Sequence, residues 1–208
     1  LLTRKLKRKK VLKMEQFALC DVVMTQIKVS GGATHSFATA DEISCEPVIE
    51  EGETKNLTIK NKLIASKQVP DMVLGHDITC KDNVFTPALL ADVQGGTVAS
   101  SGSFTKYTAP NVGAIPNTKT FDFIVYVEVV GDDGATGEYL KYTFPNCKGS
   151  FISPNFKDGE YYANEYTIKS RPALNTSLYT VDLVEELPVG VVAFKHPALE
   201  VEEEQIEE

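Results

Sequence analysis

The stretch KTFDFIVYVEVVGDDGATGEYLKYTF, residues 119–144, decides the fold class of this 208-residue chain. From Phe121 to Val129 every second residue is apolar, an alternation that turns one face of a β-strand towards a core. The GDDG that follows supplies a turn, and the run from Tyr139 to Phe144 returns as an antiparallel partner. The segment therefore predicts a β-hairpin with one buried face.

The same pattern recurs on both sides of this hairpin. Further strands are expected at residues 17–29, 41–50, 55–65, 72–81, 98–108, 161–170 and 179–185. One short helix is expected, with Thr86 as its N-cap, Pro87 at its first position and the pair Gly95-Gly96 as its stop. This inventory predicts a mostly β fold, a β-sandwich or half-barrel of about eight to nine strands with one short flanking α-helix.

Charge divides the chain into a body and two tails. Residues 1–16 are predicted to be a basic N-terminal arm, residues 17–188 one β domain, and residues 189–208 an acidic C-terminal tail. Without residues 1–16 the chain has 14 basic against 28 acidic residues, a net charge of −14, which repels nucleic-acid phosphates. No apolar run reaches membrane-spanning length and no clean signal peptide precedes the body, so no membrane association is expected.

The residues that usually carry catalysis are scattered. The four cysteines contain no CxxC pair and are expected to be reduced, half-buried core residues. None of the three histidines has metal-ligand spacing, and Asp132-Asp133-Gly134 is interpreted as a turn, not a calcium loop. Nucleophile-elbow and phosphate-loop motifs are missing as well. The sequence therefore predicts a protein that is not an enzyme and has no metal or cofactor.

Three segments carry a resemblance to a known family. They are ISCEPVIEEGETKNLTIKNKLIASK from position 43, VLGHDITCKDNVFTPALLADVQGG from position 73, and YTFPNCKGSF with KDGEYYANEYTIKSRPA from position 142. In this order they resemble the phage major tail proteins, the subunits of the tail tube, over roughly residues 17–188. The first segment resembles the long, charged two-strand region of that family, the second its strand–helix–glycine segment, and the third its C-terminal half.

The resemblance implies a structural subunit that assembles with copies of itself into hexameric rings, stacked into a hollow conduit for genome delivery. It implies a tape-measure protein, a tail terminator and a baseplate or distal tail protein as partners, and viral DNA passing through the lumen without specific binding. The expected location is the virion, after synthesis in the bacterial host cytoplasm. The tube of a contractile injection system is one alternative. A β-sandwich adhesin or binding module is another, which the absence of Trp and of an export signal disfavours.

Three regions are candidates for contacts between subunits. The ring-stacking candidates are Glu46, Glu50, Glu51, Glu53, Lys55, Lys60, Lys62 and Lys67. The candidates in a connection rich in proline, glycine and asparagine are Pro110, Asn111, Val112, Ile115 and Pro116. The arm candidates are Arg4, Lys5, Lys7 and Arg8, which we expect to meet the acidic C-terminal segment. A solvated hairpin, a passive surface loop and solvated tails are the respective alternatives.

Overall fold

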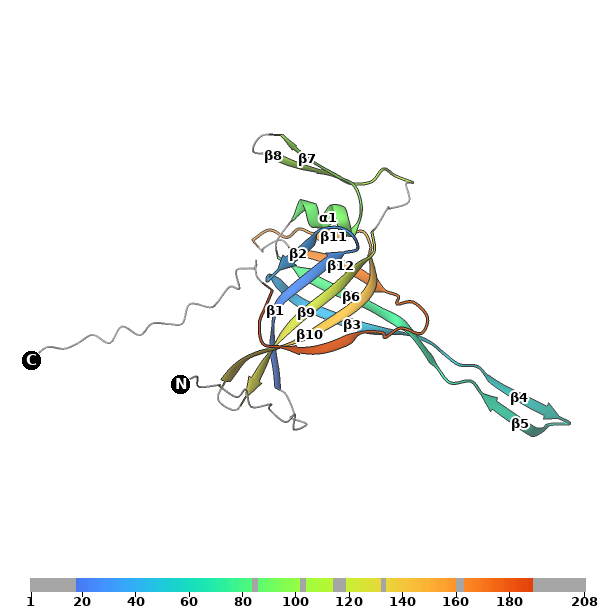
Figure 1. The fold of residues 1–208 in the computed structure, drawn as a ribbon. Helices are drawn as coiled ribbons and strands as arrows, with labels where there is room; N and C mark the ends of the chain where they lie inside the picture. The colour runs from blue at the N-terminus through green and yellow to red at the C-terminus, as the bar shows by residue number, and fades with distance from the viewer. Residues whose placement is uncertain are drawn as a thin grey trace, which may run out of the picture.

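The computed structural model describes residues 18–83, 86–101, 104–113, 119–131, 134–159 and 163–188. Most of this chain is β-structure (Figure 1). The strands are β1 (Ala18–Val29), β2 (Thr34–Phe37), β3 (Ala40–Glu50), β4 (Thr54–Ile59), β5 (Lys62–Gln68), β6 (Met72–Asp82), β7 (Thr97–Ser101), β8 (Phe104–Thr108), β9 (Phe121–Gly131), β10 (Gly134–Gly149), β11 (Ser153–Asn155), β12 (Ala163–Ser170) and β13 (Thr180–Val184). The helix α1 covers Pro87–Val93.

Nine strands form one antiparallel sheet in the order β2-β1-β9-β10-β12-β6-β3, with β11 added to β12 and β13 added to β10. The sheet curls until β3 comes near β1 (Figure 1), but no ladder of hydrogen bonds closes the seam between them. The predicted mostly β fold with one short flanking helix is therefore confirmed, in its half-barrel form.

The inner face of the curled sheet holds the core. Phe121, Phe123 and Val125 of β9 point into it, as their alternation predicts, and they pack with residues from β1, β6, β10 and β12. The helix α1 lies across one end of the curl and adds three buried side chains, Leu89, Leu90 and Val93. One end of the half-barrel is thus closed by a helix, and burial of its three aliphatic side chains stabilises the closure.

Two predicted strands are β-hairpins, so the prediction of single strands at 55–65 and 98–108 is wrong. In the first, Ile59 pairs with Lys62 around a two-residue turn, and both turn residues have positive φ, 47° at Lys60 and 61° at Asn61. This is the backbone of a type I′ turn, which usually contains glycine. Because Lys60 is an unusual residue at such a position, the sequence carries no clear turn signal there, and residues 55–65 were predicted as one continuous strand.

Smaller differences separate the expectation from the structure. The strands β2 and β11 were not expected, and β10 begins earlier and ends later than the predicted run. Thr86 is the N-cap of α1, as predicted, but its side chain makes no capping hydrogen bond. All four cysteines are free; Cys80 and Cys147 are buried, whereas the prediction of half-buried core positions is wrong for the exposed Cys20 and Cys45.

Both predicted tails, residues 1–16 and 189–208, lie outside the described residues. Within the described ranges, no helix combines the length and the apolar character needed to cross a membrane.

Candidate assembly surfaces

The most prominent feature of the molecule is a ribbon that we call the arm, residues 49–74. It contains the end of β3, the hairpin β4–β5 and the start of β6, and it projects well beyond the curled sheet (Figure 1). Almost all of its side chains are exposed. The exposed large apolar residues on it are Ile49, Leu57, Ile59, Leu63, Ile64, Met72, Val73 and Leu74. Exposed apolar side chains in this number on one projection mark a surface that binds another molecule.

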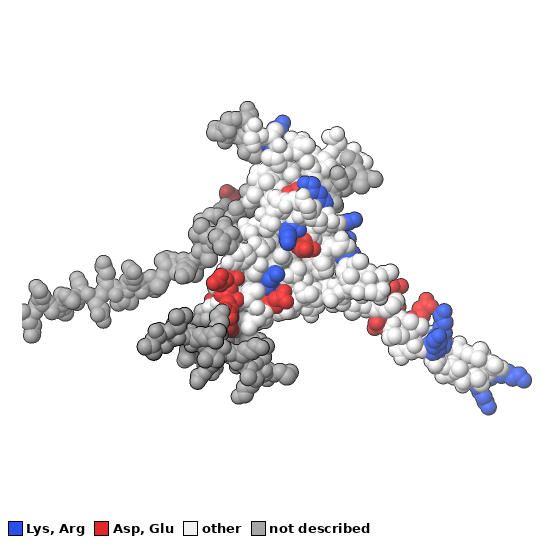
Figure 2. Space-filling model, viewed as in Figure 1, with Lys and Arg blue, Asp and Glu red and all other residues white. Residues whose placement is uncertain are grey.

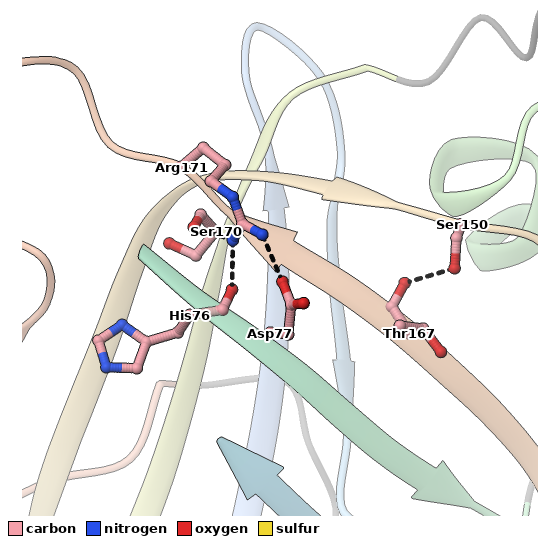
Figure 3. A network of polar contacts seen from close by, with 6 residues as sticks. All are labelled: His76, Asp77, Ser150, Thr167, Ser170 and Arg171. Atoms are coloured by element: carbon pink, nitrogen blue, oxygen red, sulfur yellow. Dashed lines mark hydrogen bonds and ion pairs between the residues drawn. The ribbon is translucent and has the colours of Figure 1, made fainter. Parts of the chain in front are cut away.

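A polar clasp fixes the base of the arm to the sheet (Figure 3). The Arg171 guanidinium donates to the carbonyl oxygens of His76 and Ser170 at 3.0 and 2.9 Å, and its Nη2 lies 2.6 Å from Oδ1 of Asp77. Asp77 is the cross-strand partner of Glu46, so Arg171 neutralises one of two carboxylates that face each other. The side chain of Arg171 thus links the strand that ends at Ser170 to the strand from which the arm departs.

Gly75 permits the close approach on which this clasp depends. A Cβ atom at Gly75 would lie 2.1 Å from the carbonyl oxygen of Ser170 and 3.2 Å from the Arg171 side chain. The β3–β6 register also shifts here, because Val48 pairs with Gly75 but Ile49 pairs with Val73. The extra residue makes a β-bulge, a feature that bends a strand. The arm therefore leaves the sheet at a defined bend.

A second irregularity divides the arm into two ribbons. The β3–β6 ladder ends at the pair Glu50–Met72, and the β4–β5 ladder begins at Thr54–Gln68. Between them the Gly52 amide donates to Oδ1 of Asp71 at 2.8 Å, and a Cβ atom at Gly52 would lie 1.7 Å from the carbonyl oxygen of Val69. Only glycine fits at this crossing of the two backbones. Gly52 therefore marks the junction between the proximal ribbon, formed by β3 and β6, and the distal ribbon, formed by β4 and β5.

The distal ribbon has a patterned face. Cross-strand pairing places Lys55 opposite Lys67, Leu57 opposite Ala65, and Ile59 opposite Lys62. Because alternate residues of a strand share a face, Leu57 and Ile59 form an aliphatic ridge with lysines at both ends. We call this face the ridge, and Figure 2 shows the lysines gathered on the distal arm. Lys55 and Lys67 repel each other across the ribbon, and no described carboxylate forms an ion pair with either.

The eight residues predicted to stack rings all lie on or next to the arm. The four glutamates lie in and after β3, on the proximal half, and the four lysines lie on the distal half. The two charges therefore follow one another along the arm, and no ion pair among the described residues joins any glutamate of the set to any lysine of the set. Their role in stacking stays a prediction.

Several strand edges of the main sheet have no partner within the described residues. Among them are the outer edge of β3, the outer edge of β13, and the part of β1 that precedes its pairing with β2 at Thr25. The outer edges of the short strands β2 and β11 are unpaired as well. Unpaired edges present rows of backbone donors and acceptors that accept a further strand. The edges of β3 and of the early part of β1 border the seam where the half-barrel fails to close, whereas β13 lies beside β10.

An apolar hollow of about 330 Å³ opens into the half-barrel near this seam. Its lining comes from five strands and from Tyr179, which precedes β13: Val22, Ile43, Cys45, His76, Val125, Val127, Tyr142, Phe144 and Tyr179. The His76 ring packs edge-on against Phe144 and Tyr179, with ring centres 5.5 Å apart in each case. We call this space the hollow.

Two groups in the hollow have unusual surroundings. His76 is only 9% exposed, and its Nδ1 is buried without a hydrogen-bond partner among the described residues. Cys45 is exposed as a residue, yet burial around its thiol raises the pKa to about 11, which keeps the thiol protonated at neutral pH. A buried polar atom without a partner costs free energy, so the surroundings of His76 Nδ1 are destabilising by themselves.

Three acidic residues are neighbours in sequence of residues that line the hollow. Asp21 precedes Val22, Glu128 follows Val127, and Glu46 follows Cys45. Because successive side chains of a strand point to opposite faces, Glu128 and Glu46 point away from the hollow. No described lysine, arginine or histidine forms an ion pair with these three carboxylates. Figure 2 shows acidic side chains gathered at the end of the body away from the arm. Charge is therefore divided along the molecule, with carboxylates on the body and lysines towards the tip of the arm.

The helix α1 is held over its end of the barrel by charged side chains. Nε2 of His35 in β2 lies 2.7 Å from Oδ2 of Asp92, and Nζ of Lys119 lies 2.8 Å from Oδ1. Burial alone would raise the pKa of Asp92, but the hydrogen bonds from Lys119 and His35 outweigh it and hold the pKa below its usual range. Asp92 thus connects three segments of the chain.

The remaining predicted regions are only partly described. Pro110, Asn111 and Val112 follow β8, with Asn111 and Val112 fully on the surface, while Ile115 and Pro116 lie outside the described residues. Four candidates in the predicted basic N-terminal segment also lie outside the described residues: Arg4, Lys5, Lys7 and Arg8. In the described part of the chain, no three residues among His, Cys, Asp and Glu are grouped so that they could hold a metal ion.

Sequence reasoning did not find the clasp, the Gly52 crossing or the hollow. Arg171 lies in the segment that carries the family resemblance, and nothing in the local pattern pairs it with Asp77, 94 residues away. Gly52, in a run of glutamates, was a visible signal, since an isolated glycine between strands often marks a close backbone approach.

No protein-family model matches the chain, and a search of curated proteins also gives no match. Among the solved structures to which this chain is similar are the following three chains. The tube-terminating cap of the anti-feeding prophage is 10% identical, with a TM-score of 0.44 over 87% of this chain and 100% of that chain. A chain of the extended sheath–tube complex of the PVC extracellular contractile injection system is 13% identical, with a TM-score of 0.40 over 79% and 91%. A chain of the anti-feeding prophage baseplate is 7% identical, with a TM-score of 0.40 over 84% and 100%. At these values the similarities establish neither a family nor a function for this chain.

Proposed function

We propose that this chain is a structural subunit of a phage tail tube, which assembles with identical copies into stacked hexameric rings around a conduit for genome delivery. The arm is the observation that carries the proposal. It extends from the body, and eight large apolar side chains on it are exposed to solvent. Such a ribbon gains stability when its apolar face is covered. The tube and the number of six subunits in each ring come from the resemblance in sequence to the phage major tail proteins.

The unpaired edges of β3 and β13 support lateral contact between subunits. Each edge leaves backbone groups without a strand partner in the described chain. Two different edges on one molecule favour a head-to-tail contact, and head-to-tail contacts close into a ring when the rotation between neighbours allows it. In this proposal the edges form the ring, and the arm reaches the next ring along the tube.

The charge of the body suits a conduit for DNA. Outside residues 1–16 the chain has a net charge of −14, which repels phosphates and keeps a duplex from binding to the wall. The proposal leaves the tube without a specific DNA site. Its expected partners are a tape-measure protein, a tail terminator and a baseplate or distal tail protein, in the virion.

Two further regions complete the proposal. The connection around Pro110, Asn111 and Val112 lies on the surface directly after β8, where a neighbouring subunit can reach it. Opposite charge favours contact between residues 1–16 of one subunit and residues 189–208 of another. Removal of residues 199–208 tests this contact, because it should change the salt dependence of assembly.

Electron microscopy of the purified full-length protein over a range of concentrations tests the function. We expect hollow tubes or stacked rings at high concentration. The matched variant lacks residues 54–68 and joins Glu53 to Val69 through an Asn-Gly turn; the Val69 amide already lies 3.2 Å from the Glu53 carbonyl oxygen, so a short turn can connect them. It should fold and form rings that no longer stack. A protein that stays monomeric at every concentration, with and without a tape-measure protein, contradicts the proposal.

A further inference from the structure

A groove of about 570 Å³ lies beside β2. Thr34 and Ser36 line it with side chains from one face of the strand, and His35 and Phe37 line it with side chains from the other face. One space can touch both faces of a strand only where it passes around an edge, and β1 occupies the inner edge, so the groove follows the outer one. Leu89 of α1 also lines it. We call this space the β2 groove.

The backbone of β2 presents hydrogen-bonding groups to this groove. The Val29 amide donates to the Ala33 carbonyl oxygen at 3.0 Å, where the β1–β2 ladder begins. Every second pair of an antiparallel ladder exchanges hydrogen bonds, so the next residue of β2 that bonds to β1 is His35. The N–H and C=O groups of Thr34 and Ser36 therefore point to the outer edge, where no described strand pairs with them.

The last described residue leads into the β2 groove. Leu187 packs on the outer face of the sheet, against the buried cluster of Met24, Ile124 and Tyr126. The residue after it, Pro188, is itself part of the groove lining. The chain that continues from Pro188 is therefore delivered to the outer edge of β2.

The six residues that follow, VGVVAF at positions 189–194, have a composition that suits a strand in an apolar setting. They contain three valines and a phenylalanine, which favour strands, and no charged residue. Pro197 follows, and proline ends strand pairing. Six extended residues span about 20 Å, so the run is long enough to pair with all four residues of β2.

We propose that residues 189–194 of the same chain pair with the outer edge of β2 as a further strand and fill the β2 groove. The backbone groups of Thr34 and Ser36 then gain partners, and the apolar side chains of the segment contact Phe37 and Leu89. Because Pro188 already lies in the groove, the chain offers this segment to its own β2 at a higher effective concentration than a second copy does.

This strand has two consequences for the subunit. It covers an edge that would otherwise accept a strand from another chain. It also moves the beginning of the acidic tail from residue 189 to residue 198, because residues 189–194 then belong to the β domain. The inference goes beyond the proposed function, since it concerns the subunit before assembly.

Hydrogen exchange of single amides, measured by NMR at concentrations below those of assembly, tests the pairing. The amides of Thr34 and Ser36, which we call the edge amides, should exchange at least about a hundredfold more slowly in the full chain than in a variant that stops after Pro188. A variant that stops after Pro197 is the matched control and should keep the slow exchange. The His35 amide bonds to β1 and should stay protected in all three proteins.

A second pair of variants makes the same comparison in chains of full length. Val191→Pro combined with Val192→Pro blocks the strand, because neighbouring amides of a strand point to opposite sides and one of the two must bond to β2. Val201→Pro combined with Glu202→Pro is the matched control in the acidic tail. The first pair should release the edge amides to fast exchange, and the second should leave them protected.

A mixing experiment identifies the chain that supplies the strand. The isotope-labelled variant with the two prolines at 191 and 192 is mixed with an equal amount of unlabelled full-length protein. Its edge amides should still exchange fast, because each full-length chain fills its own groove. Protection that appears in the mixture shows that the segment comes from another copy and overturns the assignment to the same chain.

The outcomes separate this inference from the proposed function. Edge amides that exchange at the same rate in the full chain and in the variants, whether fast or slow, overturn the added strand and leave the tube function standing. Failure of the full chain to form tubes overturns the function and leaves the strand standing, because its exchange is measured on the unassembled subunit.

Discussion

A Cβ atom placed on Gly75 would lie 2.1 Å from the carbonyl oxygen of Ser170. The approach brings β6 close to the end of β12, where the Arg171 side chain forms its ion pair with Asp77. Four expectations follow from this and from other contacts in the structure.

Gly75→Ala should lower the free energy of unfolding by about 2 kcal/mol or more, because the methyl group forces two backbones apart. Urea denaturation measures the loss. Gly131→Ala is the control: its Cβ would meet a methyl group of Thr136 at 3.3 Å and the Gly134 carbonyl oxygen at an ordinary contact distance of 3.8 Å, so the change should be small. Equal losses in both variants would contradict the importance of the Gly75 approach.

A pair of leucines should separate stability from assembly. Leu89→Ala removes a side chain that is 1% exposed under α1 and should cost about 2–5 kcal/mol of stability. Leu57→Ala, on the ridge, should change stability by less than about 0.5 kcal/mol but weaken assembly. Chemical denaturation and light scattering measure the two effects. Normal assembly of Leu57→Ala would indicate that the ridge is only a solvated surface.

The contacts of Asp92 should make stability depend on pH. Its pKa is lower in the folded chain, so the contribution is complete above the unfolded value of about 3.9 and is lost as the pH falls through the lower, folded value. Urea unfolding as a function of pH should show this loss on the acid side. Asp92→Asn should flatten that part of the profile, whereas Asp182→Asn, at an exposed ion pair, should leave it almost unchanged.

The four thiols should react in a fixed order. Cys20 is exposed and should be modified first, followed more slowly by Cys45, whose pKa burial raises to about 11. Burial raises the pKa values of Cys80 and Cys147 to about 12, so both should react only on unfolding. A thiol-reactive dye with mass spectrometry gives the order. Modification of Cys80 in the folded protein as fast as Cys20 would contradict the burial described here.

The sequence was sufficient for elements whose burial is periodic. The alternation in β9 predicted its inward face, and Thr86, Pro87 and the glycine pair placed α1 almost to the residue. The β4–β5 hairpin was missed, since its turn residues Lys60 and Asn61 take left-handed backbone conformations that no local pattern announces. The β7–β8 hairpin was missed although Gly102 stands between its two strands in the sequence. The hollow was beyond local reasoning, because its lining comes from residues between Val22 and Tyr179 that only the curl of the sheet brings together.

The crossing at Gly52 has a mechanical consequence. Strands rise about 3.3 Å per residue, so the tip of the distal ribbon lies on the order of 25 Å from this glycine, and a rotation of roughly 10° there swings the tip by about 4 Å. A small change in backbone angle at the crossing therefore produces a much larger displacement at the tip. Main-chain geometry at Gly52 thus sets the position of the lysines on the distal ribbon, and a substitution that changes this geometry can displace them without altering a contact surface.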